Sequence, residues 1–221
     1  MKYTYHIESV THDIADNFLQ RHHYLAQQGN GFLSKVNYGL FRNDGKYIGV
    51  ITFGGISVVE TLIGAFDGFD RQSPQGGFWE LTRLSMDDDT KEKNLTSWFV
   101  SKAIKELRRT HTVRAIISYA DSTYHNGYIY QATNFKYYGL TAQKSDFFEV
   151  QEDGTEKQIW RGGVKGHNGE WRQRSRKHRY MLLYDKSLSV KWKEQPYPKG
   201  NNSEYELTEP EEQQFLIYDY L

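Results

Sequence analysis

The sequence has no cysteine among its 221 residues. Disulfide bonds, a thiol nucleophile and cysteine metal ligands are therefore excluded. The chain also has no apolar run approaching the roughly 18 residues of a membrane span. Its first residues, MKYTYHIESV, lack the apolar middle of a signal peptide. These absences predict a soluble, cytosolic protein without membrane attachment.

Glycine-rich phosphate-binding motifs are missing too. No G-x-G-x-x-G follows a predicted strand, and the chain has no P-loop. The turn that leads into the predicted helix 94–109 reads DDDTKEKN, residues 87–94. The helix N-terminus and the two lysines would attract a phosphate there, whereas the three aspartates would oppose it.

Charges of opposite sign are separated along the chain, although the formal net charge is zero. Residues 161–200 contain 11 Lys/Arg and 3 Asp/Glu, whereas residues 201–221 contain 6 Asp/Glu and no Lys/Arg. We therefore expect a body of residues 1–160, a basic arm with a closing strand over 161–200, and an acidic tail over 201–221. The arm is either a solvated surface or a nucleic-acid footprint. The expected nucleic-acid contacts are Trp171, Arg172, Arg174, Arg176 and Lys177.

Apolar periodicity predicts an α/β fold with a mixed central sheet flanked by helices. In chain order we expect a strand at 2–10, a helix at 12–28, a hairpin at 36–55, a strand at 78–86, a helix at 94–109, a strand at 113–120, a short helix at 128–134 and strands at 145–150 and 179–184. Helix 94–109 has one apolar stripe, formed by Leu95, Phe99, Val100, Ala103, Ile104 and Leu107. The order predicts antiparallel hairpins first and then one parallel crossover over 78–120.

Polar side chains gather where the central strands end, which is where such sheets bind ligands. Asp121 follows strand 113–120, and could act as a base, orient an amine or bind metal, or could only cap a turn. Arg83 lies in the apolar strand WELTRL and needs an anionic partner. Asp121 is the expected partner, since strand alternation points Glu80 to the opposite face. Tyr130 lies on the short helix that follows.

A pair of histidines stands near the end of helix 12–28. His22 is expected on the apolar face, whereas His23 and Tyr24 turn away from it. Two adjacent histidines do not have metal-ligand spacing by themselves. An iron site would need further ligands, for example Asp121 or His125.

Taken together, the segments HHYL, YGLF, IGVITFGG, ELTRL and SYAD…GYIYQATNF resemble the phage Mom family of adenine-modifying proteins, which have an acetyltransferase-like (GNAT) fold. The resemblance covers residues 20–140 and the closing KHRY. It implies a GNAT-like catalytic domain with catalytic positions at His23, Tyr24, Arg83, Asp121 and Tyr130. It implies a modification enzyme in the cytoplasm of the bacterial host, which converts adenine in double-stranded phage DNA to an N6-carbamoylmethyl derivative and so blocks host restriction. Iron, held by His23 and Asp121, would be a cofactor.

The same resemblance implies acetyl-CoA as the carbon donor, with contacts expected at Leu84, Lys93 and Asn94. An ordinary GNAT enzyme binds the pyrophosphate with a glycine-containing loop, and the corresponding DDDTKEKNLTS has no glycine. Asp121 would hold or deprotonate the exocyclic amine of a flipped adenine, between tyrosines. The alternatives are a plain GNAT acetyltransferase acting on another amine and a non-catalytic DNA-binding protein. The oligomeric state is open, with a homodimer as one option.

Overall fold

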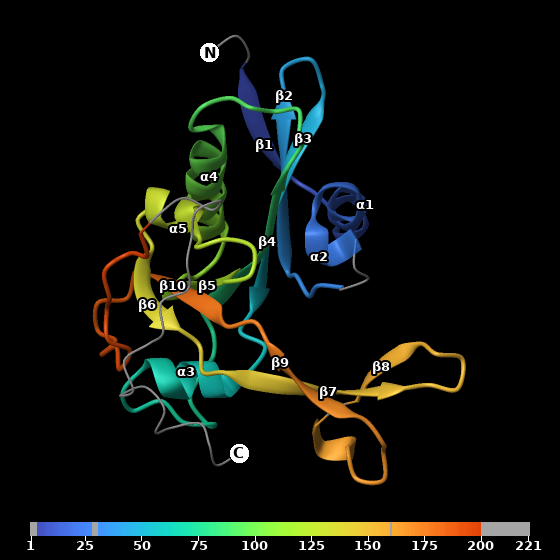
Figure 1. Cartoon of the computed structure of the whole chain (residues 1–221). Helices are drawn as coiled ribbons and strands as arrows, with labels where there is room; N and C mark the ends of the chain where they lie inside the picture. The colour runs from blue at the N-terminus through green and yellow to red at the C-terminus, as the bar shows by residue number, and fades with distance from the viewer. Residues whose placement is uncertain (1–3, 28–30, 160, 200–221) are drawn as a thin grey trace.

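The computed structural model describes residues 4–27, 31–159 and 161–199, so the expected acidic tail over 201–221 lies outside the described residues. A seven-stranded sheet forms the centre of the molecule, with strand order β1-β2-β3-β4-β5-β10-β6 (Figure 1). Its strands are β1 (Tyr5–Ser9), β2 (Val36–Arg42), β3 (Tyr47–Gly55), β4 (Phe78–Met86), β5 (Ala115–Asp121), β6 (Lys136–Leu140) and β10 (Lys177–Leu183). The pair β4–β5 is parallel and the other neighbours are antiparallel. The predicted mixed sheet with a parallel crossover is confirmed.

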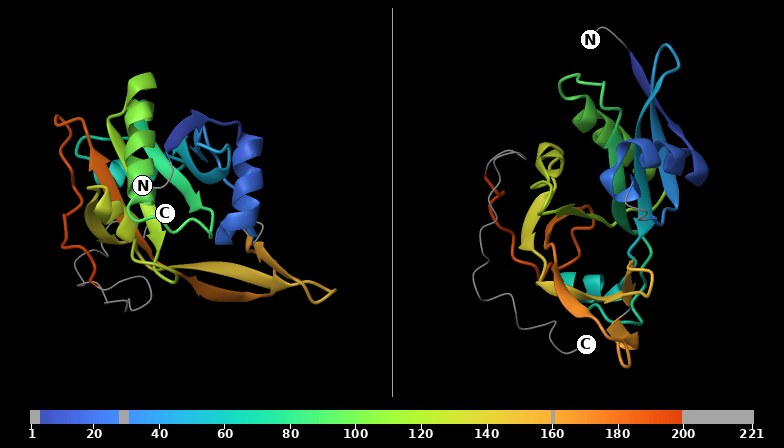
Figure 2. Two further views of the ribbon diagram at one scale, coloured as in Figure 1. Left: turned by 90° about the horizontal axis from the view of Figure 1, so that it is seen from above. Right: turned by 45° about the vertical axis from the view of Figure 1, so that its right-hand side comes forward.

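Helices cover both faces of this sheet (Figures 1 and 2). α4 (Leu95–Thr110) and α5 (Tyr128–Ala132) pack with the largest apolar cluster. On the other face lie α1 (His12–His22), the short α2 (Tyr24–Gln27) and α3 (Val59–Ala65). Among the described residues, no helix is long and apolar enough to cross a membrane.

The first helix is not continuous, contrary to the prediction of one helix over 12–28. The chain leaves the helical conformation at His23, with φ −124° and ψ 120°, and α2 begins at the next residue. Apolar periodicity does not report such a break, because the residues on both sides still pack inward. The break turns His23 and Tyr24 toward the centre of the sheet.

The two central parallel strands part before they end. β4 and β5 pair from Phe78 and Ala115 up to Leu81 and Ser118 only, and Ser118 Oγ closes the paired part by donating to the Leu81 carbonyl at 2.9 Å. Beyond this point β4 continues to Met86 and β5 to Asp121 without pairing to each other. The central sheet is therefore open between β4 and β5 at their carboxyl ends.

A β-bulge lies at the start of this opening. Thr52 of β3 is opposite Arg83, and the next residue of β3, Phe53, is opposite Leu81, so Thr82 is an extra residue in β4. The hydroxyls of Thr52 and Thr82 are 2.7 Å apart and form a hydrogen bond that holds the bulge in place. An extra residue reverses the alternation of side chains along a strand.

The segment 144–174 forms a second, three-stranded sheet of order β8-β7-β9, which projects from the body (Figures 1 and 2). Its strands are β7 (Lys144–Val150), β8 (Glu156–Ile159) and β9 (Glu170–Arg174), with the 3-10 turn η1 (Arg161–Gly163) between the last two. β9 leads directly into β10, which lies between β5 and β6 in the central sheet. The basic segment of the sequence is therefore divided between the projecting sheet and the body.

Candidate active site

A cavity of about 610 Å³ lies where β4 and β5 part. Four parts of the chain line it: the α1–α2 junction, β4, the segment from the end of β5 into α5, and the β9–β10 junction. Its lining includes all five expected catalytic side chains, which are His23, Tyr24, Arg83, Asp121 and Tyr130. It also includes Glu80, His125, Arg174 and Lys177, which we did not expect among the catalytic residues.

The break after α1 supplies two neutral aromatic side chains. The rings of His23 and Tyr24 are stacked with centroids 4.9 Å apart, and His23 Nδ1 accepts a hydrogen bond from the Leu25 amide at 3.2 Å. Burial, with the nearby Arg83 and His125, lowers the pKa of His23 to about 4. Burial, with the charge of Asp121, raises the pKa of Tyr24 to about 12. Both side chains are therefore uncharged at neutral pH.

Arg83 is held by backbone carbonyls instead of a carboxylate. Its Nη1 donates to the Thr82 carbonyl at 2.8 Å, and its Nη2 donates to the Gly31 carbonyl at 3.1 Å. The expected ion pair between Arg83 and Asp121 is therefore wrong. Burial lowers the pKa of Arg83, but a guanidinium stays charged at any physiological pH.

Glu80 lines the same cavity as Arg83, contrary to the prediction that it points to the opposite face. The bulge at Thr82 is the reason, because an extra residue between the two puts positions 80 and 83 on one side of the strand. Burial raises the pKa of Glu80 to about 7, and the charge of Arg83 only partly opposes this rise. No regular alternation pattern in the sequence could have found this residue.

Asp121 ends β5 and is engaged by three donors. The Lys177 ammonium forms an ion pair with its Oδ2, Ser175 Oγ donates to the same oxygen at 2.9 Å, and the Thr123 amide donates to Oδ1 at 3.0 Å. Burial alone would raise the pKa of Asp121, but these hydrogen bonds lower it overall. Asp121 is thus a firmly ionised carboxylate, and it shapes the turn as well as the cavity.

Tyr130 forms the innermost part of the cavity. It lies on α5 with only 6% of its surface exposed, and its ring packs against Phe135 and Tyr180. Burial raises its pKa, so the phenol is a neutral hydrogen-bond donor at neutral pH. The structure therefore brings the five expected side chains together around one space.

The residues expected to bind nucleic acid have different surroundings. Arg174 lines the cavity, 3.5 Å from Asp146, and Lys177 lies inside the cavity on Asp121. Trp171 is 53% exposed on the projecting sheet. Arg172 is bound by Glu156 at 2.8 Å and by Glu170. Arg176 is buried and donates to the Thr141 carbonyl at 2.7 Å, so a surface phosphate contact at this residue is wrong.

The donor set does not fit the expected iron centre. Among the residues that the structure describes, no three His, Asp or Glu side chains lie close enough to hold a metal ion. Lys177 already occupies the carboxylate of Asp121, and a cation on that oxygen would repel a metal. His23 and Asp121 share the cavity but do not form a metal site.

The expected acetyl-CoA contacts divide into two groups. Leu84 lines the cavity on the part of β4 that is not paired with β5. Lys93 and Asn94 lie exposed in the turn before α4. Asn94 occupies the N-cap position, but its φ is 64° and its side chain makes no capping hydrogen bond.

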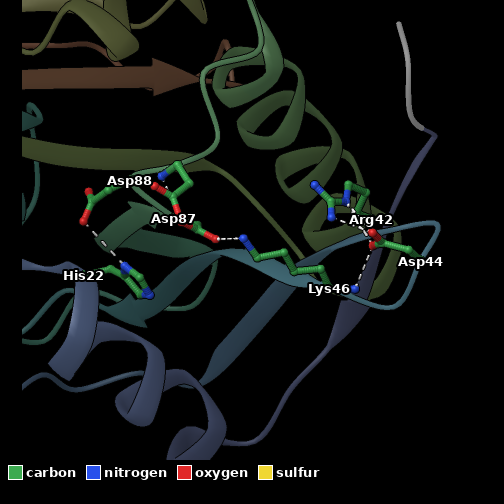
Figure 3. Close-up of polar contacts among 7 residues, drawn as sticks. His22, Arg42, Asp44, Lys46, Asp87 and Asp88 are labelled. Carbon is green, nitrogen blue, oxygen red and sulfur yellow. Dashed lines mark hydrogen bonds and ion pairs between the residues drawn. The ribbon is translucent and has the colours of Figure 1, made fainter.

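The first aspartate of that turn, Asp87, is buried against the body (Figure 3), whereas Asp88 and Asp89 are exposed. Asp87 accepts from Lys46 Nζ at 2.6 Å, and the Asp88 carboxylate lies 3.7 Å from His22 Nδ1. The turn has no glycine, and Asp88 remains 87% exposed beside the helix N-terminus. The turn therefore does not fit a pyrophosphate, because exposed carboxylates would repel it.

Comparisons with known proteins agree with the resemblance seen in the motifs. The model of the Mom protein family matches residues 4–199. No curated protein sequence matches the chain. Solved structures similar to it include a Bacillus subtilis acetyltransferase in complex with CoA (14% identity, 82% of this chain and 99% of that one, TM-score 0.47). They also include the ribosomal-protein-S18-alanine N-acetyltransferase of Escherichia coli (14% identity, 81% of this chain and 94% of that one, TM-score 0.46). A third is Arabidopsis thaliana NAA60 in complex with acetyl-CoA (10% identity, 82% of this chain and 100% of that one, TM-score 0.47).

Proposed function

Because the chain belongs to the Mom protein family, we propose that it is a DNA-modifying transferase. It converts adenine in double-stranded DNA to an N6-carbamoylmethyl derivative and thereby protects that DNA from restriction enzymes. One observation carries the proposal: five side chains from three separate segments converge on one cavity, namely His23, Tyr24, Arg83, Asp121 and Tyr130.

The cavity suits a base that has left the duplex. Its volume lies within the range of roughly 300–1,000 Å³ for small-molecule sites. The N6 group of adenine is paired inside the double helix, so the nucleotide must rotate out before its amine can react. Tyr24 and Tyr124 lie with ring centroids 4.3 Å apart, and Tyr124 is 46% exposed. These rings offer aromatic surface on which an extruded base stacks.

The fixed charges of the cavity suit a polar substrate. Arg83 is held in place by carbonyls and keeps donor groups to spare, which suits the oxygen or ring nitrogen of a substrate. His23 and Tyr130 are neutral, so they donate or accept hydrogen bonds without adding charge. Acetyl-CoA is the proposed source of the transferred carbons, and it would lie along the part of β4 that is not paired with β5, at Leu84.

A transferase that acts on an amine outside DNA is the second candidate. One observation favours it: the positive charge expected to hold DNA is offset on the projecting sheet, where Arg172 is bound by Glu156 and Glu170. Transfer of an acetyl group to a small amine or a protein in the absence of DNA would identify this activity.

Restriction digestion tests the proposed function. Plasmid DNA from bacteria that express the protein is expected to resist restriction enzymes whose sites contain adenine. Enzymes with sites made only of G and C should cut the same DNA normally, which serves as the control. Full sensitivity to both groups, with the protein well expressed, would contradict the proposal.

A further inference from the structure

Glu80 is a half-buried carboxylate without a structural partner. Among the residues that the structure describes, no hydrogen bond or ion pair reaches its side chain, and its cationic neighbour Arg83 donates to the carbonyls of Thr82 and Gly31 instead. Removing a carboxylate from water without compensation costs stability. Because Glu80 costs stability and lines the cavity, its presence there indicates that it acts on the molecule that the cavity binds.

The backbone is built to place Glu80 there. The bulge at Thr82 turns positions 80 and 83 to one side of β4, and the hydrogen bond between the Thr52 and Thr82 hydroxyls fixes the bulge. Without the extra residue, Glu80 would face away from Arg83. Bulges that re-aim a side chain are common beside active sites.

Asp121, a second carboxylate of the cavity, is not free to accept a proton. Lys177, Ser175 and the Thr123 amide all donate to it. These donors lower its pKa, and a carboxylate with a low pKa is a weak base. Lys177 would also have to move before a substrate amine could reach Oδ2.

We propose that Glu80 is the catalytic proton acceptor of this site, and that Asp121 is a positioning residue that holds Lys177 at the cavity wall. The proposal rests on the proposed function and assigns its acid–base step. The exocyclic nitrogen of adenine forms a bond to the methylene carbon of a donor of the class X–CH2–C(O)NH2, where X is a leaving group. The bond between that carbon and X breaks with its electron pair on X, and a proton from the nitrogen passes to a Glu80 oxygen, which gives the N6-carbamoylmethyl base.

The charges around Glu80 agree with this role. Its neighbours in the sheet, Gly54 on β3 and Ile117 on β5, carry no charge. The titratable and charged groups that share the cavity are His22, His23, Tyr24, Arg83, Asp88, Tyr119, Asp121, His125, Tyr130, Arg174 and Lys177. Burial raises the pKa of Glu80 to about 7, so that near neutral pH the carboxylate is both present and basic enough to take a proton.

The first experiment measures the titration of Glu80 itself. Carbon-13 spectra of protein labelled at glutamate carboxyl groups give one resonance per glutamate, and Glu80→Gln identifies the resonance of interest. We expect Glu80 to titrate near pH 7 in the folded protein, and the same resonance in urea-unfolded protein serves as the reference for a glutamate in water. Titration of Glu80 at the same pH in the folded and the unfolded protein would overturn the proposal.

The second experiment measures activity. Modified adenine in DNA from cells that express Glu80→Gln should fall by about 10²–10⁴-fold relative to the unsubstituted protein. Glu80→Asp, which keeps a carboxylate, should recover part of the loss, and the control Glu152→Gln should lose nothing. Unchanged modification in Glu80→Gln would overturn the proposal while leaving the proposed function intact. Unmodified DNA from the unsubstituted protein would instead overturn the proposed function, and the titration would still decide whether Glu80 is a poised base.

Discussion

Glu80 and Asp121 show how one cavity gives two carboxylates opposite properties. Burial without a donor raises the pKa of Glu80 to about 7, whereas donors from Lys177, Ser175 and Thr123 lower the pKa of Asp121. Two titratable groups whose surroundings separate their pKa values are a recurring sign of divided acid–base roles. The difference arises from hydrogen-bond donors, because Asp121 is the more buried side chain by surface exposure and yet is the one whose pKa is lowered.

The raised pKa of Glu80 predicts a pH-dependent stability. The folded protein holds the Glu80 proton up to about pH 7, whereas the unfolded chain loses it near 4.5. The folded state therefore binds more protons in this window, and the free energy of unfolding falls as the pH rises from 4.5 to 7. Glu80→Gln should remove this fall and be more stable than the parent at pH 8 by about 2 kcal/mol. Urea denaturation across this pH range measures it, and a parallel pH dependence in both proteins would contradict it.

The ion pair of Asp121 and Lys177 predicts that substitutions at these two residues have non-additive effects on stability. Asp121 is 8% exposed, so removal of Lys177 leaves its charge buried without its main partner. Lys177→Met should therefore cost about 3 kcal/mol, and the double variant Asp121→Asn/Lys177→Met should cost less than that single substitution. Chemical denaturation of Lys177→Met, Asp121→Asn and the double variant tests this. Additive losses from the two sites would show that the pair is not coupled in the folded protein.

Among the helices and strands, those with a clear apolar period were predictable from the sequence, because this period depends on neighbouring residues alone. The stripe expected on helix 94–109 is the buried face of α4, from Leu95 to Leu107, because a 3.6-residue period follows from helix geometry alone. Strands 78–86 and 113–120 are β4 and β5, apart from small shifts at their ends. These two strands also placed Arg83 and Asp121 correctly at one site.

Features that depend on pairing between distant strands were not predictable in this way. The bulge at Thr82 exists because β3 and β4 come into register around an extra residue, and the periodicity of β4 carries no sign of it. The insertion of β10 between β5 and β6 brings Lys177 opposite Asp121, although 56 residues separate them. The sequence therefore identified the five expected catalytic residues of the cavity but assigned the wrong surroundings to Glu80 and Lys177, which also line it.

The projecting sheet gives a testable difference between two arginines of β9. Arg172 is bound by Glu156 and Glu170, whereas Arg174 lies 3.5 Å from one carboxylate and lines the cavity. If duplex DNA approaches the cavity, Arg174→Gln should reduce the dependence of log affinity on log salt by about one unit. Arg172→Gln should leave that slope almost unchanged. Fluorescence anisotropy over a salt series measures both, and a larger effect from Arg172 would contradict this account of the sheet.

In the whole molecule, the site forms where the two central strands of the sheet separate. β4 and β5 pair for four residues and then separate, and the α1–α2 break, α5 and β10 each bring side chains to the resulting space. Helices on both faces keep the opening from collapsing, since α4 and α1 pack against opposite sides of the sheet (Figure 2). An opening between central strands is where sheets of this class bind small ligands.

We propose that this cavity modifies the N6 group of adenine in DNA, and the product itself is the best test. Mass spectrometry detects it in nucleosides prepared from the DNA of cells expressing the protein or its Asp121→Ala variant. We expect a deoxyadenosine derivative heavier by one carbamoylmethyl group with the parent protein, and none with the variant at equal expression and folding. Detection of an acetylated adenine would instead show that the activity is simple acetyl transfer. Unmodified adenine with the parent protein would contradict the claim.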